Sequence, residues 1–347
     1  MYISRFLRLL PFVLALLFPS LVPLSAQTVD VENVGKYMKE AKKGKKEAQF
    51  NVGVCYAKGY GGDVNLEEAV YWYRLSAAQG FVRAQYNLAL CFEDGSGVKA
   101  NPDSAVYWYT RAARQGYRPA MYNMAMLYAK TSSAIHDCAK AIRWYTEAAD
   151  SGMVEAQYML ARCYADGDCA KRDSASAQHW YTKAADNGDV RAQTALGLML
   201  VGDSHAGNDS TAVRYLEMAS KQGNATAQST LGSCYYRGQG VEKDYVSAAH
   251  WYSKAALGGN VEALTNLGVC YQNGHGVAQD YAKAFHYYDM AAHQDNALAK
   301  YNLGLCYYYG YGVAQDIKSA KFWLGKALQS GKLGGREAQW VEKVLDE

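Results

Sequence analysis

The chain has 347 residues, with 36 lysines and arginines against 33 aspartates and glutamates, and a net charge of +3. This near balance provides neither a basic field for nucleic-acid phosphates nor an acidic tail, so we expect no nucleic-acid partner. With 5 prolines and 30 tyrosines, the composition favours helices and is rich in aromatic contact area.

Residues 1–26 form a candidate signal peptide. Arg5 and Arg8 precede an apolar run that continues to Val22. Small residues ending at Ala26 are suited to cleavage. A membrane anchor is the alternative, but the run is shorter than the roughly 20 apolar residues of a span and contains prolines. We therefore expect an exported protein, periplasmic or secreted, and not an integral membrane protein.

An alanine recurs every 36 residues along the rest of the chain, with one interval of 35. The positions are Ala48, Ala84, Ala120, Ala156, Ala192, Ala227, Ala263 and Ala299. Each lies on the apolar stripe of a first helix, and the stripe of a second helix follows. Residues 48–334 are thus predicted to form eight helix pairs that cover one another's apolar faces. Residues 27–47 would add an N-terminal capping half-repeat, and residues 335–347 a C-terminal capping helix.

The second helix of most copies carries the pattern Ala-x-x-Trp-Tyr. It begins at Ala69, Ala105, Ala141, Ala177 and Ala248, and it is softened in the other copies. Small alanines let helices approach and the aromatics fill the space between pairs, so we interpret this stripe as core and not as a cofactor site. Between the two helices, most copies have a Gly-x-Gly loop such as Gly238-Gln239-Gly240. Its glycines can take the positive φ that ends a helix and turns the chain.

These units resemble the Sel-one-like repeat, a relative of the tetratricopeptide repeat. Leu231-Gly232 with Tyr235, and the loop Gly238-x-Gly240-Val241, carry the resemblance in one copy, and other copies repeat them. It covers essentially the whole chain after the N-terminal segment. It implies an all-α fold, a right-handed α-solenoid of about eight helix-turn-helix repeats of 36 residues. Such proteins use a concave surface, lined by first helices, chiefly to hold proteins or peptides.

Six of the eight cysteines share one repeat position on the apolar stripe. They are Cys55, Cys91, Cys163, Cys234, Cys270 and Cys306. Equivalent positions on packed helices lie about 8–10 Å apart, and a disulfide needs Cα atoms within about 7 Å, so we expect six buried free thiols. We call these six the cysteine ladder. Cys138 and Cys169 lie outside this ladder, between the helices of the third and fourth copies. Because neighbouring loops can meet and an exported protein meets an oxidising compartment, a Cys138–Cys169 disulfide is our hypothesis. Two free thiols are the alternative.

The sequence contains no pattern that indicates catalysis. Cys-x-x-Cys and His-Glu-x-x-His are absent, and the seven histidines form no ligand cluster. Ser-Asp-Asn and Lys-Thr-Gly, which accompany the serine nucleophile of β-lactamases, are also absent. We expect no catalytic site, cofactor or metal.

The first helices carry a candidate partner-binding set on the face turned away from the helix-pair core. Its members are Tyr86, Leu90, Glu93, Tyr122, Met126, Tyr158, Arg162, Tyr301, Leu305 and Tyr308. Middle copies carry small polar residues there, such as Thr194, Ser229 and Thr265. Tyrosine combines contact area with a hydroxyl, which suits protein recognition. The alternative is that these tyrosines pack against the next first helix.

The expected function is a non-catalytic scaffold that binds a protein or peptide on its concave surface. Two alternatives are a carbohydrate- or peptidoglycan-binding envelope protein, because aromatic grooves also stack on sugars, and a protein with weak penicillin-binding or β-lactamase-like activity. The sequence does not indicate the oligomeric state.

Overall fold

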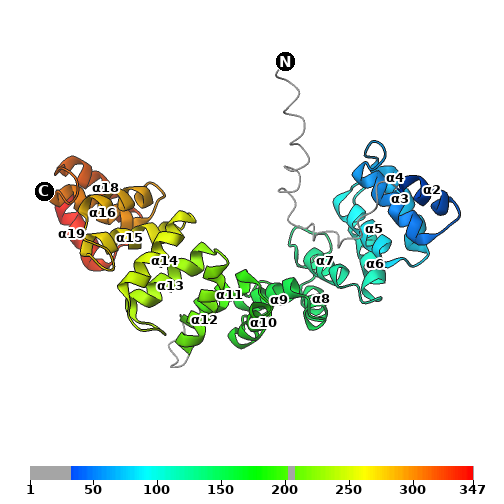
Figure 1. The fold of residues 1–347 in the computed structure, drawn as a ribbon, viewed down its shortest axis with the longest axis horizontal. Coiled ribbons are helices and arrows are strands. Elements are labelled where there is room, and N and C mark those ends of the chain that lie inside the picture. The colour runs from blue at the N-terminus through cyan, green and yellow to red at the C-terminus, as the bar shows by residue number, and fades with distance from the viewer. Residues whose placement is uncertain (1–32, 202–207, 347) are drawn as a thin grey trace, which may run out of the picture. The chain divides into compact units, whose positions relative to one another are not determined.

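The computed structural model describes residues 33–201 and 208–346, and the candidate signal peptide lies outside them. These residues form helices and no strand, as the coloured ribbon of Figure 1 shows, which confirms the predicted all-α class. The helices are α2 (Val34–Lys42), α3 (Lys46–Lys58), α4 (Leu66–Ala78), α5 (Val82–Asp94), α6 (Pro102–Ala113), α7 (Arg118–Ala129), α8 (Cys138–Asp150), α9 (Val154–Asp166), α10 (Ser174–Asp186), α11 (Val190–Val201), α12 (Asn208–Lys221), α13 (Ala225–Arg237), α14 (Tyr245–Leu257), α15 (Val261–Asn273), α16 (Tyr281–Ala292), α17 (Ala297–Tyr309), α18 (Ile317–Gln329) and α19 (Gly335–Asp346).

The chain divides into two compact units, Met1–Ala177 (unit 1) and Gln178–Glu347 (unit 2), and each is described by itself. In unit 1, each of the helices α3, α5 and α7 packs against the helix that follows it. In unit 2, α11, α13, α15 and α17 do the same. Each second helix within a unit also packs against the next first helix. This unbroken succession of contacts is the predicted solenoid packing.

The Leu-Gly dipeptide of the first helix makes room for the tyrosine of the second helix. A Cβ on Gly232 would lie 2.8 Å from the ring of Tyr252, and one on Gly268 would lie 2.5 Å from the ring of Tyr288. Both tyrosines are buried. In unit 2, glycine at this position therefore lets the two helices of a pair approach until the ring lies on the helix backbone.

Each glycine of the Gly-x-Gly loop has its own role. The first, such as Gly274, takes a left-handed conformation and ends the first helix, as predicted. The second also has positive φ, but it packs against the start of the preceding repeat's second helix. The contacts join Gly97 to Leu66, Gly240 to Asp209, Gly276 to Tyr245 and Gly312 to Tyr281. A Cβ at any of these glycines would overlap the backbone carbonyl 31 residues earlier. The second glycine therefore sets the spacing between repeats.

Buried glutamines connect consecutive helix pairs. In unit 1, Gln85 donates from Nε2 to the carbonyl of Ala77 at 3.2 Å and accepts from Gln115 at 2.7 Å. In unit 2, Gln193 donates to the carbonyl of Ala185 and accepts from Gln222 in the same way. These bonds give a second donor to carbonyls at the end of a helix, because those of Ala77 and Ala185 also accept from the backbone N–H groups of Gly80 and Gly188.

The two terminal helices cover the ends of the array. On α2, Ala41 is buried against Ala48 and Trp72. On α19, Val341 and Val344 are buried against Leu324 of the last pair. Both helices lie within the predicted capping segments, so the apolar stripes of the first and last repeats are covered.

The six cysteines of the ladder are free, as predicted, and five of them are buried, whereas Cys91 is only half-buried. Burial raises the pKa of the Cys234 and Cys270 thiols to about 11 and that of Cys306 to about 12. These side chains are neutral at physiological pH and act as small apolar core residues.

Candidate functional site

The ten residues of the predicted partner-binding set lie on four first helices. Seven belong to α5, α7 and α9 of unit 1, and three belong to α17 of unit 2. Equivalent repeat positions place the members of each unit on one side of their helices. Their burial differs widely, however, and it decides which of them can meet a partner.

Tyr86 belongs to the core, which corrects its place in the predicted set. Its side chain is 6% exposed. Its ring centroid lies 5.9 Å from that of Tyr109 and 5.2 Å from that of Tyr117. Its hydroxyl accepts a hydrogen bond from Nδ2 of Asn123 at 3.1 Å, and burial raises its pKa. For Tyr86, the alternative interpretation of inter-helix packing is the correct one.

Glu93 joins this buried network to the surface. The hydroxyl of Tyr109 donates to Oε2 of the half-buried Glu93 at 2.5 Å. In the seventh repeat, a neutral glutamine, Gln272, accepts from Tyr288 in the equivalent arrangement at 2.7 Å. Burial raises the pKa of the Glu93 carboxyl. A neutral glutamine could therefore accept the same hydrogen bond, but the second repeat has the carboxylate of Glu93, which is partly desolvated.

Replacing Glu93 with glutamine should stabilise the protein at pH 7, and the gain should vanish towards pH 4. Because the native pKa is raised above the ordinary 4.5, the native state binds more protons than the unfolded state between these two values. Stability is therefore lost as the pH rises through this window. The amide removes the desolvated charge and its oxygen can still accept from Tyr109. Urea denaturation at pH 4, 5.5 and 7 tests this, with exposed Glu67→Gln as the control, and a gain that does not depend on pH contradicts it.

Six members of the predicted set remain on α5, α7 and α9, and all six are half-buried. This first-helix face comprises Leu90, Glu93, Tyr122, Met126, Tyr158 and Arg162. The ring of Tyr122 lies 5.9 Å from that of Tyr145 in the core. The guanidinium of Arg162 forms an ion pair with Asp166 at 3.4 Å. The face therefore combines aromatic, thioether and aliphatic groups with one acid and one base.

Two of the three predicted residues of α17, Tyr301 and Tyr308, pack against the C-terminal helix. The ring centroid of Tyr301 lies 6.3 Å from that of Trp340 on α19, and that of Tyr308 lies 5.6 Å from it. Both tyrosines pack against the small core formed with Val341 and Val344. Leu305 is half-buried. In this repeat the tyrosines anchor the capping helix, so they are weaker contact candidates than those of unit 1.

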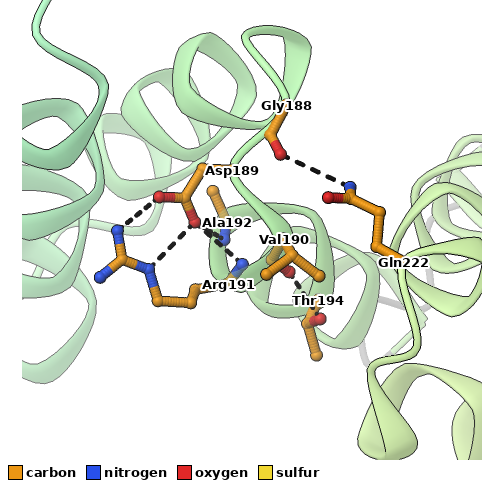
Figure 2. A network of polar contacts seen from close by, with 7 residues as sticks. All are labelled: Gly188, Asp189, Val190, Arg191, Ala192, Thr194 and Gln222. Atoms are coloured by element: carbon orange, nitrogen blue, oxygen red, sulfur yellow. Dashed lines mark hydrogen bonds and ion pairs between the residues drawn. The ribbon is translucent and has the colours of Figure 1, made fainter. Parts of the chain in front are cut away.

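The small polar residues of the middle copies are mostly satisfied within their own helices. Figure 2 shows Thr194 on α11, whose hydroxyl donates to the carbonyl of Val190 at 2.7 Å. In the same view, the Asp189 carboxylate accepts from the backbone N–H groups of Arg191 and Ala192 at the start of the helix. Thr194, Ser229 and Thr265 are all buried. They provide little surface for a partner.

Unit 2 contains a polar cavity of about 610 Å³ that the sequence did not indicate. It is formed where the first helices α13 and α15 meet residues 294–298. The charged and amide side chains that line it are Arg237, Glu262, Asn266, Gln294, Asp295, Asn296 and Lys332. Two bases and two acids balance one another. The periodic pattern could not predict it, because its residues come from the end of α13, the first half of α15 and the segments around residues 294–298 and 332, and not from one stripe.

A Ser-x-x-Lys stretch, Ser96 to Lys99, lies in the Gly-x-Gly loop after α5. The backbone N–H of Ser96 donates to the carbonyl of Cys91 and so helps to end that helix. Because the stretch is a loop, its spacing does not place serine and lysine on one helical face. We interpret it as a turn and not as a serine nucleophile with its base.

Among residues 33–201 and 208–346, no group of three or more His, Cys, Asp or Glu side chains is arranged to hold a metal ion. Within the same ranges, no helix has the length and apolar character needed to cross a membrane.

Cys138 and Cys169 are joined by a disulfide in unit 1, with their Cα atoms 4.8 Å apart. Cys138 is the first residue of α8, and Cys169 lies in the loop after α9. Both are half-buried, and Nε2 of His136 lies 3.7 Å from the Cys138 sulfur.

Successive helix pairs, each packed on the next, define a helical-repeat protein of the α-solenoid class. Eight Sel1 repeats match this chain, at residues 46–81, 82–117, 118–153, 154–189, 190–224, 225–260, 261–296 and 297–332. The chain therefore belongs to the Sel1 repeat family. Sel1 repeats typically form scaffolds for protein–protein interaction.

Two solved structures are similar over most of their lengths. The Sel1 repeat protein from Oxalobacter formigenes is 28% identical, with a TM-score of 0.70, and the match covers 95% of this chain and 99% of that one. The protective antigen c5321 of uropathogenic Escherichia coli, which has an SLR fold, is also 28% identical. Its TM-score is 0.58, and the match covers 91% of this chain and 78% of that one. No match was found among curated proteins.

Proposed function

We propose that this protein is an exported, non-catalytic scaffold that binds a protein or peptide on the first-helix face of unit 1. One observation carries the proposal. On α5, α7 and α9, packing leaves apolar and aromatic side chains half-exposed at equivalent positions. In unit 2, the positions equivalent to Tyr122 carry Thr194, Ser229 and Thr265, which are buried, and Tyr301, which packs against Trp340 of α19. The position equivalent to Leu90 carries Leu198 on α11, which is 43% exposed, without an aromatic neighbour at the Tyr122 position.

The chemistry of this face suits a peptide with apolar anchors and mixed charge. Tyr122 and Tyr158 offer large, stiff contact areas with a polar edge. Met126 can adapt its shape to different apolar side chains. Glu93 and Arg162 at the margins would favour a base and an acid, respectively, on the partner.

Export is supported by two independent features. The N-terminal pattern is typical of a signal peptide, with Arg5 and Arg8 before an apolar run. The Cys138–Cys169 disulfide is of the kind that persists in oxidising compartments such as the periplasm or the extracellular space.

A carbohydrate-binding function is the second candidate, and exposed aromatic rings in unit 2 favour it. Tyr281, Tyr309 and Tyr311 are 39%, 51% and 41% exposed. The ring centroids of Tyr281 and Tyr311 lie 5.2 Å apart in a stacked arrangement. Rings of this kind can stack on sugars.

We expect the mature chain, residues 27–347, to retain a stoichiometric protein partner from envelope extract. The triple variant Tyr122→Ala/Met126→Ala/Tyr158→Ala should bind the purified partner at least about tenfold more weakly, which is about 1.4 kcal/mol. Titration calorimetry measures the affinity, and circular dichroism checks the fold. The control is Tyr71→Ala/Tyr107→Ala, which removes two exposed rings from second helices.

Equal affinity of the triple variant and the wild type would remove the first-helix face from consideration. Retention on purified peptidoglycan alone, abolished by Tyr309→Ala/Tyr311→Ala, would favour the carbohydrate function instead.

A further inference from the structure

The disulfide occupies a defined place in the repeat. At four junctions between consecutive repeats, the second loop glycine packs against a backbone carbonyl 31 residues earlier, at the start of the preceding second helix. Gly97 and Leu66 show this in unit 1, and Gly276 and Tyr245 show it in unit 2. Cys169 and Cys138 are also 31 residues apart.

The correspondence holds residue by residue. The fourth repeat reads Gly167-Asp168-Cys169-Ala170 where the second reads Gly95-Ser96-Gly97-Val98. Cys169 thus stands at the position of the second glycine. Cys138 is the first residue of α8, as Leu66 is the first residue of α4.

Cysteine cannot make the glycine contact itself. A Cβ at Gly97 would overlap the carbonyl of Leu66. Moreover, Asp295 is the one residue other than glycine with positive φ in the part of the chain that the structure describes, so Cys169 has an ordinary backbone conformation. The loop must therefore reach α8 in another way, and the disulfide brings the two Cα atoms to 4.8 Å.

We propose that the Cys138–Cys169 disulfide takes the place of the glycine contact and locks the junction between the third and fourth repeats. Reduction opens this junction and loosens the first-helix face, because Tyr122 and Met126 on α7 and Tyr158 on α9 belong to the two repeats that it joins. The link to binding rests on the proposed function, whereas the lock does not.

The redox step is an ordinary thiol–disulfide exchange. A dithiol reductant supplies two electrons and two protons, the S–S bond breaks, each cysteine sulfur takes one proton, and the reductant becomes a disulfide. Bonded sulfurs lie about 2.05 Å apart, whereas non-bonded heavy atoms stay about 3.5–4.0 Å apart. Reduction therefore removes the covalent link between the loop and the start of α8, and the two sulfurs separate.

The test compares three forms of the mature chain, with and without a phosphine reductant. The oxidised wild type should lose about 5–10 °C of melting temperature on reduction. Cys138→Ser/Cys169→Ser should melt like the reduced wild type and ignore the reductant. Cys138→Leu/Cys169→Gly rebuilds the pattern of the second repeat, so it should recover part of the loss and also ignore the reductant.

Hydrogen exchange localises the effect. On reduction, exchange should accelerate in peptides covering α7 to α9 and stay unchanged in α3 and α4. Free thiols at Cys138 and Cys169 in the purified, air-oxidised protein, or an unchanged melting temperature on reduction, would overturn the lock. If the Leu/Gly variant melted at the same temperature as the Ser/Ser variant, the disulfide would not be equivalent to the glycine contact.

Partner affinity is measured separately on the same samples. Weaker binding by the reduced wild type, restored in the Leu/Gly variant, supports the link to the first-helix face. Faster exchange with unchanged affinity overturns that link and leaves the lock in place. A failure of the oxidised protein to bind any protein would count against the proposed function, while the melting and exchange results would still decide the lock.

Discussion

Replacing Gly276 with alanine should destabilise unit 2 by about 2–5 kcal/mol, one of the two largest effects that we expect. Two costs combine. Its positive φ is unfavourable for alanine by about 1–2 kcal/mol. The new Cβ would also overlap the backbone carbonyl of Tyr245, which cannot rotate away as a side chain could. Overpacking of this kind typically costs a further 1–3 kcal/mol.

Gly274→Ala is the matched control. Gly274 lies in the same loop and has nearly the same positive φ, +69° against +75° for Gly276. A Cβ there would meet its nearest neighbour, the Cβ of Gln279, at 3.4 Å, which is ordinary contact. This variant should therefore lose only the conformational part, about 1–2 kcal/mol. Urea denaturation followed by circular dichroism measures both, and equal losses would contradict a role in repeat spacing.

Most of the fold could be predicted from the sequence because the repeated positions can be read directly along the chain. Alanines every 36 residues determine which helices pair, and Gly238 or Gly274 marks where a first helix ends. The second glycine was harder to interpret. Its φ could be predicted, but its contact with a residue 31 positions earlier depends on how two repeats dock, and no single helix pair contains that information.

The contact face was predicted less well, because equivalent repeat positions do not guarantee equivalent burial. Tyr86 and Tyr122 occupy the same position in consecutive repeats, yet Tyr86 is buried and Tyr122 is half-exposed. The neighbours make the difference, since Tyr117 and Asn123 both contact Tyr86. Likewise, Tyr301 packs against Trp340, a residue outside the repeats. Such contacts come from the particular residues of neighbouring elements and not from the motif.

The pair Tyr86 and Tyr122 therefore provides the sharpest test of core against surface. Tyr86→Ala should lower the free energy of unfolding by about 3–5 kcal/mol, as expected for a large buried side chain. It would leave a cavity beside Tyr109 and remove the hydroxyl that accepts from Asn123. Tyr122→Ala, at the equivalent repeat position, should lose about 1 kcal/mol because its ring is already partly exposed to water.

For binding, the order of the two positions should be reversed: a change at Tyr122 should weaken partner affinity, and a change at Tyr86 that preserves the core should not. Tyr122→Ala should keep its helical signal and weaken partner affinity, because it removes contact area from the first-helix face. Tyr86→Phe keeps the buried ring and removes only the hydroxyl, so it should bind as the wild type does and lose about 1 kcal/mol of stability. Urea denaturation and calorimetric titration of the three variants measure both properties. If Tyr86→Phe weakened binding while Tyr122→Ala did not, the partner would contact the buried network and the face would have to be redrawn around Glu93 and Tyr109.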